Sequence, residues 1–377
     1  MIFPLGEEWC GIYLHVPFCV SKCHYCDFLS HPQRPVEEME RYVETLLWEA
    51  ETRLPRITDE FSRFTVYLGG GTPTSLPPKL LERILSRIPT LLPHVEEITV
   101  EANPHGLNEG LLSMLEERGV TRLSLGVQSL DPRVLKTLGR GSGSGEITEA
   151  LELSRGRRFS LSVDLIYGAP YQTCQTVAED IKRVIAFSPH HISAYSLTLE
   201  GEVPLKKAVE KGVHPMPDDE EWQRQFFTVR ELLEKAGYVH YETSNFARGE
   251  SYCLHNLIYW SNGSYLGLGL GAVSHLGGRR WGNPRCMGEY LARKIEPAWE
   301  ESLPHPQKAA ETAILLLRTR WGIHRRDPIV QNSGIRKRLE RLTQQGLLSF
   351  KDESWRIPAH LQPVANEVLS LLLEGSD

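Results

Sequence analysis

The stretch HVPFCVSKCHYCDF, residues 15–28, places three cysteines within eight positions: Cys19, Cys23 and Cys26. It overlaps the end of GIYLHV (11–16), an apolar run of the composition typical of β-strands. A strand that opens into a loop with three thiols predicts a site at the carboxyl end of that strand. What three neighbouring thiolates can bind without an obvious fourth therefore decides the class of protein.

More strand-like runs follow along the chain, and segments with helical periodicity separate them. In the first helical segment, apolar residues recur at intervals of three and four between Val36 and Leu54. Asn108 stands where an N-capping residue would precede another helical segment, EGLLSMLEE. The strand-like runs are residues 11–16, 64–71, 97–104, 122–129, 160–168 and 191–197, and the helical segments are 36–54, 80–88, 107–117, 147–155, 177–187 and 219–236. This alternation predicts a parallel sheet with helices outside it.

Nearly every predicted strand ends in a polar or glycine-rich motif. These ends are Cys19 onward, Gly69–Gly71, Glu101–Asn103, Gln128–Ser129, Asp164 and Tyr195. In a parallel barrel such ends converge on one face, where active sites form. The pattern favours an α/β fold with a partial (β/α)₆ barrel over a doubly wound sheet.

The composition changes after the predicted barrel, which we expect to cover residues 1–238. Residues 239–300 are aromatic and glycine-rich, contain HNLIYW, and are expected to extend or cap the barrel; 296–307 resemble a linker. Residues 308–377 predict a small α+β winged-helix-like domain, with a hairpin formed by LLSF and WRI around KDES. A basic cluster lies on one of its predicted helices, and a solvated helix face explains it better than a nucleic-acid contact. Its members are Arg336, Lys337, Arg338 and Arg341.

The bulk properties are those of a soluble protein. The 377 residues carry a formal net charge of −6, which argues against binding nucleic acid through bulk charge. There is no basic segment followed by an apolar run at the N-terminus and no run of about 18 apolar residues. The seven scattered cysteines do not form a disulfide framework. We expect a cytoplasmic protein without a transmembrane segment, for which peripheral membrane association stays open.

Three interpretations compete for the three cysteines. Structural zinc normally takes four ligands, and His24, between two of the cysteines, is poorly placed to complete a tetrahedron. Inert buried thiols fit badly with the neighbouring Lys22 and Asp27. A [4Fe–4S] cluster needs one protein ligand per iron, so three thiolates would leave one iron open to a small molecule. The third interpretation is favoured, because it gives the missing ligand a function.

The spacing C-x₃-C-x₂-C after a first barrel strand resembles the signature of the radical S-adenosylmethionine (SAM) superfamily. The resemblance implies that the open iron binds the amino and carboxylate groups of SAM. GGGTP (69–73), with Gly70, Gly71 and Thr72, would let the backbone approach this ligand. The other SAM-binding candidates are Tyr13, Tyr25, Glu101, Gln128, Arg140 and Asp164. Taken singly, each polar candidate could instead be a rim or capping residue, and each tyrosine a core residue.

Further motifs narrow the resemblance to one family. They are YLHVPFCVSKCHYCDF, YLGGGTPTSL, EANP, RLSLGVQSLD, LGRG, DLIYGAPYQT, HISAYSL, YETSNFAR and HNLIYW. Their order resembles the family that contains oxygen-independent coproporphyrinogen III oxidase and the heme chaperone HemW. The oxidase pattern carries an extra cysteine where this chain has Phe28, and an N-terminal extension, whereas Cys19 follows only 18 residues. Both features resemble the chaperone branch.

The resemblance implies a protein that binds heme, a [4Fe–4S] cluster and SAM, and delivers heme to respiratory apoproteins. A reduced ferredoxin or flavodoxin would supply electrons. The alternative is an enzyme of porphyrin biosynthesis that oxidatively decarboxylates coproporphyrinogen III; a third is another radical SAM reaction. Whether the chain is an enzyme is therefore left open.

His255 is the candidate heme ligand, because it stands among aromatic residues in SYCLHNLIYWSNGSY. Cys253 is a second choice, and a structural histidine is the alternative. Two departures from the family pattern concern the heme contact. Ser142 and Val273 stand where relatives often have histidine, although His275 is close to the second position.

Overall fold

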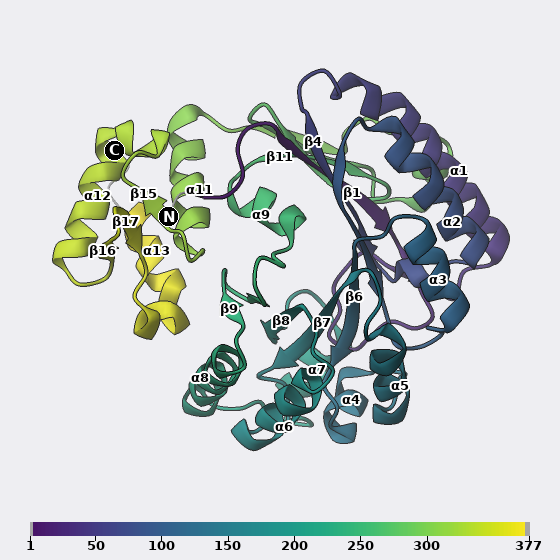
Figure 1. Cartoon of the computed structure of the whole chain (residues 1–377), viewed down its shortest axis with the longest axis horizontal. Helices are drawn as coiled ribbons and strands as arrows, with labels where there is room; N and C mark the ends of the chain where they lie inside the picture. The colour runs from purple at the N-terminus through teal and green to yellow at the C-terminus, as the bar shows by residue number, and fades with distance from the viewer. Residues whose placement is uncertain (1–2, 374–377) are drawn as a thin grey trace.

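A large mixed sheet forms the centre of the fold in the computed structural model, which describes residues 3–373. The six predicted strands are all present and lie parallel and in chain order (Figure 1). They are β1 (Trp9–Val16), β4 (Arg63–Gly70), β5 (Val95–Ala102), β6 (Arg122–Gln128), β7 (Ser160–Tyr167) and β8 (His191–Ser196). The predicted α/β class with parallel strands is confirmed.

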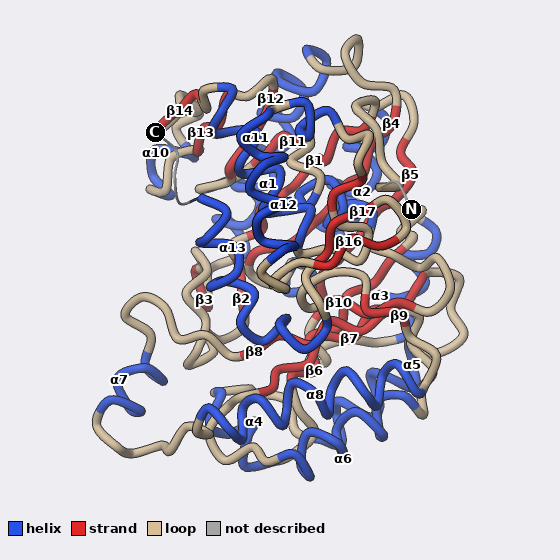
Figure 2. The backbone as a smooth tube through the Cα atoms, turned by 90° about the vertical axis from the view of Figure 1, so that its left-hand side faces the viewer, coloured by secondary structure: helices blue, strands red, loops and turns tan. Residues whose placement is uncertain are grey.

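Helices cover the outer, convex side of this sheet (Figure 1). The six predicted helical segments all form, and Asn108 caps α3 by accepting a hydrogen bond from the Leu111 amide at 3.0 Å. The short α4 and α7 have no counterpart among the predicted helices. The helices are α1 (Val36–Arg53), α2 (Pro78–Arg87), α3 (Glu109–Glu117), α4 (Pro132–Leu138), α5 (Ser144–Ser154), α6 (Cys174–Ile185), α7 (Pro204–Glu210) and α8 (Asp219–Lys235). Figure 2 shows α6 and α8 side by side below the sheet.

Residues 239–300 extend the sheet at both ends. β10 pairs antiparallel with β8, and β11 pairs parallel with β1, so strands far apart in sequence flank the six. The expected linker 296–307 is wrong in part, because β14 within it pairs with β13. The elements are β9 (Val239–His240), β10 (Asn245–Ala247), α9 (Leu254–Trp260), β11 (Ser264–Leu268), β12 (Val273–Leu276), β13 (Arg279–Gly282), α10 (Met287–Leu291) and β14 (Trp299–Ser302). The exact domain borders stay a prediction.

The C-terminal part has its own buried apolar cluster, drawn from residues 309–372. Its strands form a separate sheet in the order β15-β17-β16, and the predicted hairpin is present, with Asp352 and Glu353 at its turn. The elements are α11 (His305–Leu317), β15 (Ile323–His324), α12 (Ser333–Gln344), β16 (Ser349–Lys351), β17 (Ser354–Arg356) and α13 (Ala365–Leu373). A short parallel pair, β2 (Phe18–Cys19) and β3 (His31–Pro32), belongs to the cysteine loop.

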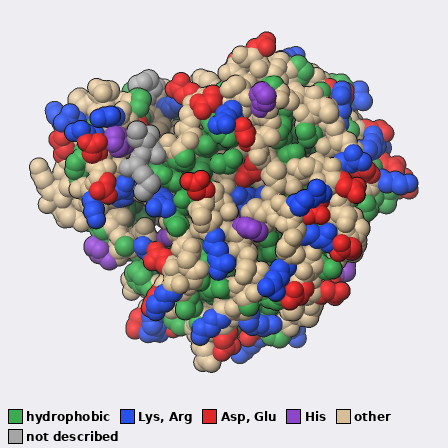
Figure 3. All heavy atoms as spheres, viewed as in Figure 1, with side chains coloured by type: hydrophobic (Ala, Val, Ile, Leu, Met, Phe, Trp, Pro, Cys, Tyr) green, Lys and Arg blue, Asp and Glu red, His purple; other side chains and the backbone are tan. Residues whose placement is uncertain are grey.

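Three of the four basic residues on α12 are engaged in contacts within the protein. Arg341 donates to the Leu371 carbonyl at 2.8 Å and Arg338 to that of Leu372 at 3.1 Å, at the end of α13. Arg336 pairs with Glu340. Figure 3 shows basic and acidic side chains intermixed on the face in view. Among the described helices, none has the length and apolarity needed to cross a membrane.

A buried carboxylate ties the late strands to α1. Glu49 is fully buried and accepts hydrogen bonds from the Gly269 amide (2.9 Å), Tyr290 (2.8 Å) and Asn283 (2.8 Å). It also pairs with Arg53 at 2.8 Å. Because these partners come from α1, the end of β11, the end of β13 and α10, one side chain holds residues 269–290 against α1.

We therefore expect Glu49→Ala to lower the free energy of unfolding by about 3 kcal/mol or more, since it leaves several buried polar groups unpaired. Chemical denaturation measures this. Glu51→Ala is the matched control on the same helix, because Glu51 and its partner Arg87 are 46% and 48% exposed. It should cost less than about 1 kcal/mol. Equal effects of the two substitutions would contradict this role of Glu49.

Candidate functional site

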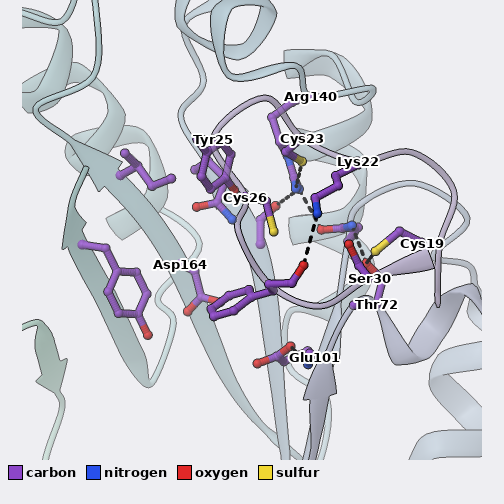
Figure 4. A pocket seen from close by; sticks show the side chains of 18 of the residues that line it. Cys19, Lys22, Cys23, Tyr25, Cys26, Ser30, Thr72, Glu101, Arg140 and Asp164 are labelled. Atoms are coloured by element: carbon purple, nitrogen blue, oxygen red, sulfur yellow. Dashed lines mark hydrogen bonds between the residues drawn. The ribbon is translucent and has the colours of Figure 1, made fainter. Parts of the chain in front are cut away.

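A cavity of about 400 Å³ lies at the carboxyl ends of the parallel strands (Figure 4). It brings together the three cysteines and every predicted SAM-binding residue except Tyr13. The predicted residues on its walls are Cys19, Cys23, Cys26, Tyr25, Gly70, Gly71, Thr72, Glu101, Gln128, Arg140 and Asp164. The convergence follows from the parallel topology, which places the ends of β4 to β7 on one face.

The glycine turn after β4 lies directly against the cysteine loop. The Gly71 amide donates to the Val16 carbonyl at 2.8 Å, and the Thr72 amide donates to that of Phe18 at 2.7 Å. A Cβ on Gly71 would lie 2.5 Å from the Phe18 oxygen, and Gly70 has a φ of +108°. Only glycine fits these two positions, so the backbone of this turn packs directly against β1 and the start of the cysteine loop.

The three thiols face the cavity from one loop and have different neighbours. Cys19 Sγ lies 3.8 Å from Thr72 Oγ1, and Arg140 Nη1 donates to Cys23 Sγ at 3.5 Å. Burial raises the pKa of Cys19 to about 11 and also raises that of Cys26. His24 points elsewhere, with Nδ1 3.1 Å from the Thr137 carbonyl. Among the described residues, no three metal-binding side chains surround a single ion position.

Arg140 is fixed at the thiol end of the cavity. Besides Cys23, its guanidinium donates to Asn103 Oδ1 at 2.8 Å and to the Gly126 carbonyl. Asn103 in turn donates to Thr72 Oγ1 at 2.8 Å. This chain of contacts orients a cation beside the open side of the loop, where it suits the carboxylate of an amino-acid ligand.

Two half-buried carboxyls face the same cavity. Glu101 accepts from Tyr67 at 2.9 Å and from the Gly70 amide at 3.1 Å, while Asp164 accepts from Ser124 at 3.0 Å. Burial raises the pKa of Glu101 to about 7, although both donors oppose the shift. Burial likewise raises the pKa of Asp164 to about 6. The empty cavity therefore disfavours the ionised form of both carboxyls. A bound cation or a hydroxyl-bearing ligand would stabilise that form.

Gln128 has a left-handed backbone, with a φ of +68°, at a register shift where β6 pairs with β7. Such a conformation in a residue other than glycine is strained, and strain of this kind concentrates at functional sites. The shift turns the end of β6 so that Gln128 lines the cavity.

Several lining residues were absent from the predicted site. Tyr67 and Ser124 lie within strands, at positions whose alternation points them inward, and sequence alone gave no sign of their role. Asn103 and Tyr195 were noted only as polar residues at strand ends. Both stand at or near the carboxyl ends of parallel strands, which is the sequence signal that indicates them.

Tyr13 and His255 lie outside this cavity. Tyr13 lines a second hollow and contacts His15 Nδ1 at 3.0 Å through its hydroxyl. His255 is 1% exposed, with Nδ1 2.8 Å from Thr65 Oγ1 and Nε2 2.9 Å from the Tyr259 hydroxyl. Burial lowers the pKa of His255 to about 3. With both ring nitrogens engaged, this geometry supports the structural alternative; Cys253 is also buried, beside Glu97.

The donor set fits an iron–sulfur cluster with a bound zwitterionic nucleotide. Three thiols share one cavity with the backbone of the glycine turn, and Arg140 lies across it from two carboxyls (Figure 4). The three cysteines would hold the cluster, while Arg140, Glu101, Asp164 and Gln128 would hold SAM. Bound there, the pair would supply one-electron chemistry, and the chain would bind, orient and shield it.

Comparison with known proteins agrees with this class. Residues 13–184 match the radical SAM superfamily. The chain is 32% identical over 380 residues to heme chaperone HemW of Mycobacterium tuberculosis strain H37Rv, covering 98% of this chain and 96% of that protein. It is 31% identical to HemW of Escherichia coli K12, covering 96% and 98%. The solved structure of E. coli coproporphyrinogen III oxidase HemN has the same fold, with a TM-score of 0.81, 21% identity, and coverage of 97% and 90%.

The fold and the cysteine loop thus define a radical SAM protein. Within that superfamily, the chain belongs to the HemW family. The predicted resemblance is confirmed at both levels. The superfamily implies the cluster and SAM, in keeping with the donor set of the cavity.

Replacing any one of Cys19, Cys23 or Cys26 with alanine should abolish the bound cluster, because each thiol would bind a different iron. Iron and sulfide analysis with the visible absorption spectrum, after anaerobic reconstitution, measures this. Cys174→Ala is the control, since Cys174 begins α6 and is not among the residues that line the cavity. A full iron complement in any of the three loop variants would contradict the ligand assignment.

The affinity for SAM should rise with pH through about 7, because the Glu101 carboxyl must ionise to attract the sulfonium cation. Asp164 ionises at lower pH and should contribute less to this slope. Calorimetric titration of the cluster-loaded protein between about pH 6 and pH 8 measures it. Glu101→Gln should flatten the profile. Glu96→Gln, on the same strand but 39% exposed and paired with Arg63, should keep the slope.

Proposed function

We propose that this protein is a heme chaperone that binds heme, a [4Fe–4S] cluster and SAM, and delivers heme to respiratory proteins. The observation that carries the proposal is the similarity, over nearly the whole length of both chains, to proteins named heme chaperone HemW. Heme transfer rather than porphyrin synthesis is the proposed role, so no net chemical turnover is required of it.

The residue at position 28 favours the chaperone over the oxidase. Phe28 stands where the oxidase pattern has a further cysteine, and its side chain is 66% exposed at the edge of the SAM cavity. The loop therefore offers three thiols and an exposed ring. Phe28 adds apolar surface, which suits a large apolar ligand.

The proposal includes partners and a location. A reduced ferredoxin or flavodoxin would supply electrons to the cluster, and heme apoproteins would receive the heme, in the cytoplasm. The side chains that would hold SAM are Arg140, toward its carboxylate, and Glu101 and Asp164, toward its cationic and hydroxyl groups. Their preset positions cost little reorganisation when the ligand binds.

An anaerobic assay that offers heme and coproporphyrinogen III side by side tests the proposal. The cluster-loaded protein should take up heme stoichiometrically and pass it to an apocytochrome, which the absorption spectrum of the recipient reports. Protoporphyrinogen should not form. Formation of protoporphyrinogen with SAM-dependent release of CO₂ would overturn the proposal in favour of the oxidase, and failure to bind heme would reject the chaperone role.

A further inference from the structure

Two of the three loop thiols are connected through hydrogen bonds between side chains. Arg140 Nη1 donates to Cys23 Sγ at 3.5 Å, and Nη2 of the same guanidinium donates to Asn103 Oδ1 at 2.8 Å. Asn103 Nδ2 donates to Thr72 Oγ1 at 2.8 Å, and this oxygen lies 3.8 Å from Cys19 Sγ. Figure 4 shows both ends of this arrangement, each beside its thiol. We call the three side chains between the thiols, Arg140, Asn103 and Thr72, the bridging network.

The groups available in the bridging network fix the direction of its hydrogen bonds. A guanidinium can only donate, so Asn103 must present its carbonyl oxygen to Arg140 and its amide nitrogen to Thr72. The Thr72 oxygen accepts this bond, and its own hydrogen stays free. A cysteine that binds iron does so as a thiolate, which carries no hydrogen. The Thr72 hydroxyl is therefore the donor toward Cys19, and donors face both sulfurs.

The neighbouring strand holds Asn103 in this orientation. Arg140 also donates to the Gly126 carbonyl, and a Cβ on Gly126 would lie 3.0 Å from Asn103 Oδ1, so β6 comes close to the amide. Asn103 is half-buried and Thr72 is 7% exposed. Hydrogen bonds are electrostatically stronger in such poorly solvated surroundings than in water. The orientation of both donors is thus set before a cluster binds.

Donors beside the sulfurs have a defined effect on an iron–sulfur cluster. Its reduction potential depends on the net charge around it and on the hydrogen bonds to its sulfurs. Reduction adds one electron, which makes the thiolate sulfurs more negative, so a donor aimed at them stabilises the reduced state more than the oxidised state. Arg140 adds a positive charge beside Cys23. Both ends of the bridging network therefore favour the reduced state.

We propose that Asn103 is a positioning residue, which aims the Thr72 hydroxyl and the Arg140 guanidinium at two of the three cluster thiolates and thereby raises the reduction potential of the cluster. The inference rests on the proposed binding of a [4Fe–4S] cluster and adds how this protein sets its potential. No bond to iron forms or breaks, and the single electron comes from the reduced ferredoxin or flavodoxin of the proposed function. Asn103 acts through its two neighbours, because both ends of its amide are bonded to them.

A redox titration tests the donor to Cys19. The anaerobically reconstituted protein is titrated with dithionite in the absence of SAM and followed by electron paramagnetic resonance. Thr72→Val removes the hydroxyl and should lower the equilibrium constant for reduction severalfold, whereas Thr72→Ser keeps the hydroxyl and should retain the parental potential. Thr74→Val is the matched control, because it makes the same change in the same turn at a buried hydroxyl that has no hydrogen-bond partner among the described residues. Its potential should equal that of the parent.

Asn103→Asp tests the positioning role. An aspartate accepts from Arg140 but cannot donate to Thr72, so the Thr72 hydroxyl should turn toward the new carboxylate and away from Cys19. The added negative charge acts in the same direction, and the equilibrium constant for reduction should fall by about tenfold, or about 59 mV for one electron. Asn108→Asp is the matched control, because Asn108 is the exposed N-cap of α3 and an aspartate caps equally well. The potential should stay parental there.

A double variant separates positioning from charge. Thr72→Val added to Asn103→Asp should lower the potential little further, because the hydroxyl no longer faces Cys19. Additive effects would show that Asn103 does not act through Thr72 and would overturn the inference.

Iron and sulfide content distinguish the remaining outcomes. The single variants should bind the parental amount of both. If they do so with the parental potential, or if they lose the cluster and the bridging network is thus only a support for the loop, the inference is wrong while the proposed function stands. If the parent itself binds no cluster after reconstitution, the proposed function fails.

Discussion

The close backbone contact between the glycine turn after β4 and the start of the cysteine loop is the constraint on which the site depends. The Gly71 and Thr72 amides donate to the carbonyls of Val16 and Phe18, and no Cβ fits at Gly71. Because β1 is paired with β4 along its length, this contact fixes where the strand ends and the loop begins. The thiols are thereby held over the ends of the neighbouring strands, instead of moving with a free surface loop.

The charges around the SAM cavity are arranged by the same topology. Arg140 lies at the thiol end of the cavity, beside Cys23 (Figure 4). Glu101 comes from the carboxyl end of β5, and Asp164 from the middle of β7. A ligand with a carboxylate at one end and cationic and hydroxyl groups along its length matches this separation. The acidic groups are poorly solvated before it binds, so their interaction with a cation is stronger than it would be at the surface.

The sequence was sufficient for the parts of the fold that local periodicity controls. All six parallel strands and their main helices were predictable, and so were the cysteines and the polar residues at strand ends, because parallel strands bring those ends together. Long-range packing was not predictable. The aromatic surroundings of His255 suggested a ligand, but the same rings bury it and Tyr259 and Thr65 occupy its nitrogens. Nothing local indicates that β11 pairs with β1, and it is this pairing that creates the second hollow.

That pairing gives the loop two faces. Asp27 and Phe28 separate the cavity suited to SAM from the second hollow, and His15 anchors the next residue to β1. A cluster held by the three thiols would constrain the loop that carries this wall, so it would also affect the shape of the second hollow. By thermodynamic linkage, a ligand in the second hollow would then affect the cluster and SAM side by the same free energy.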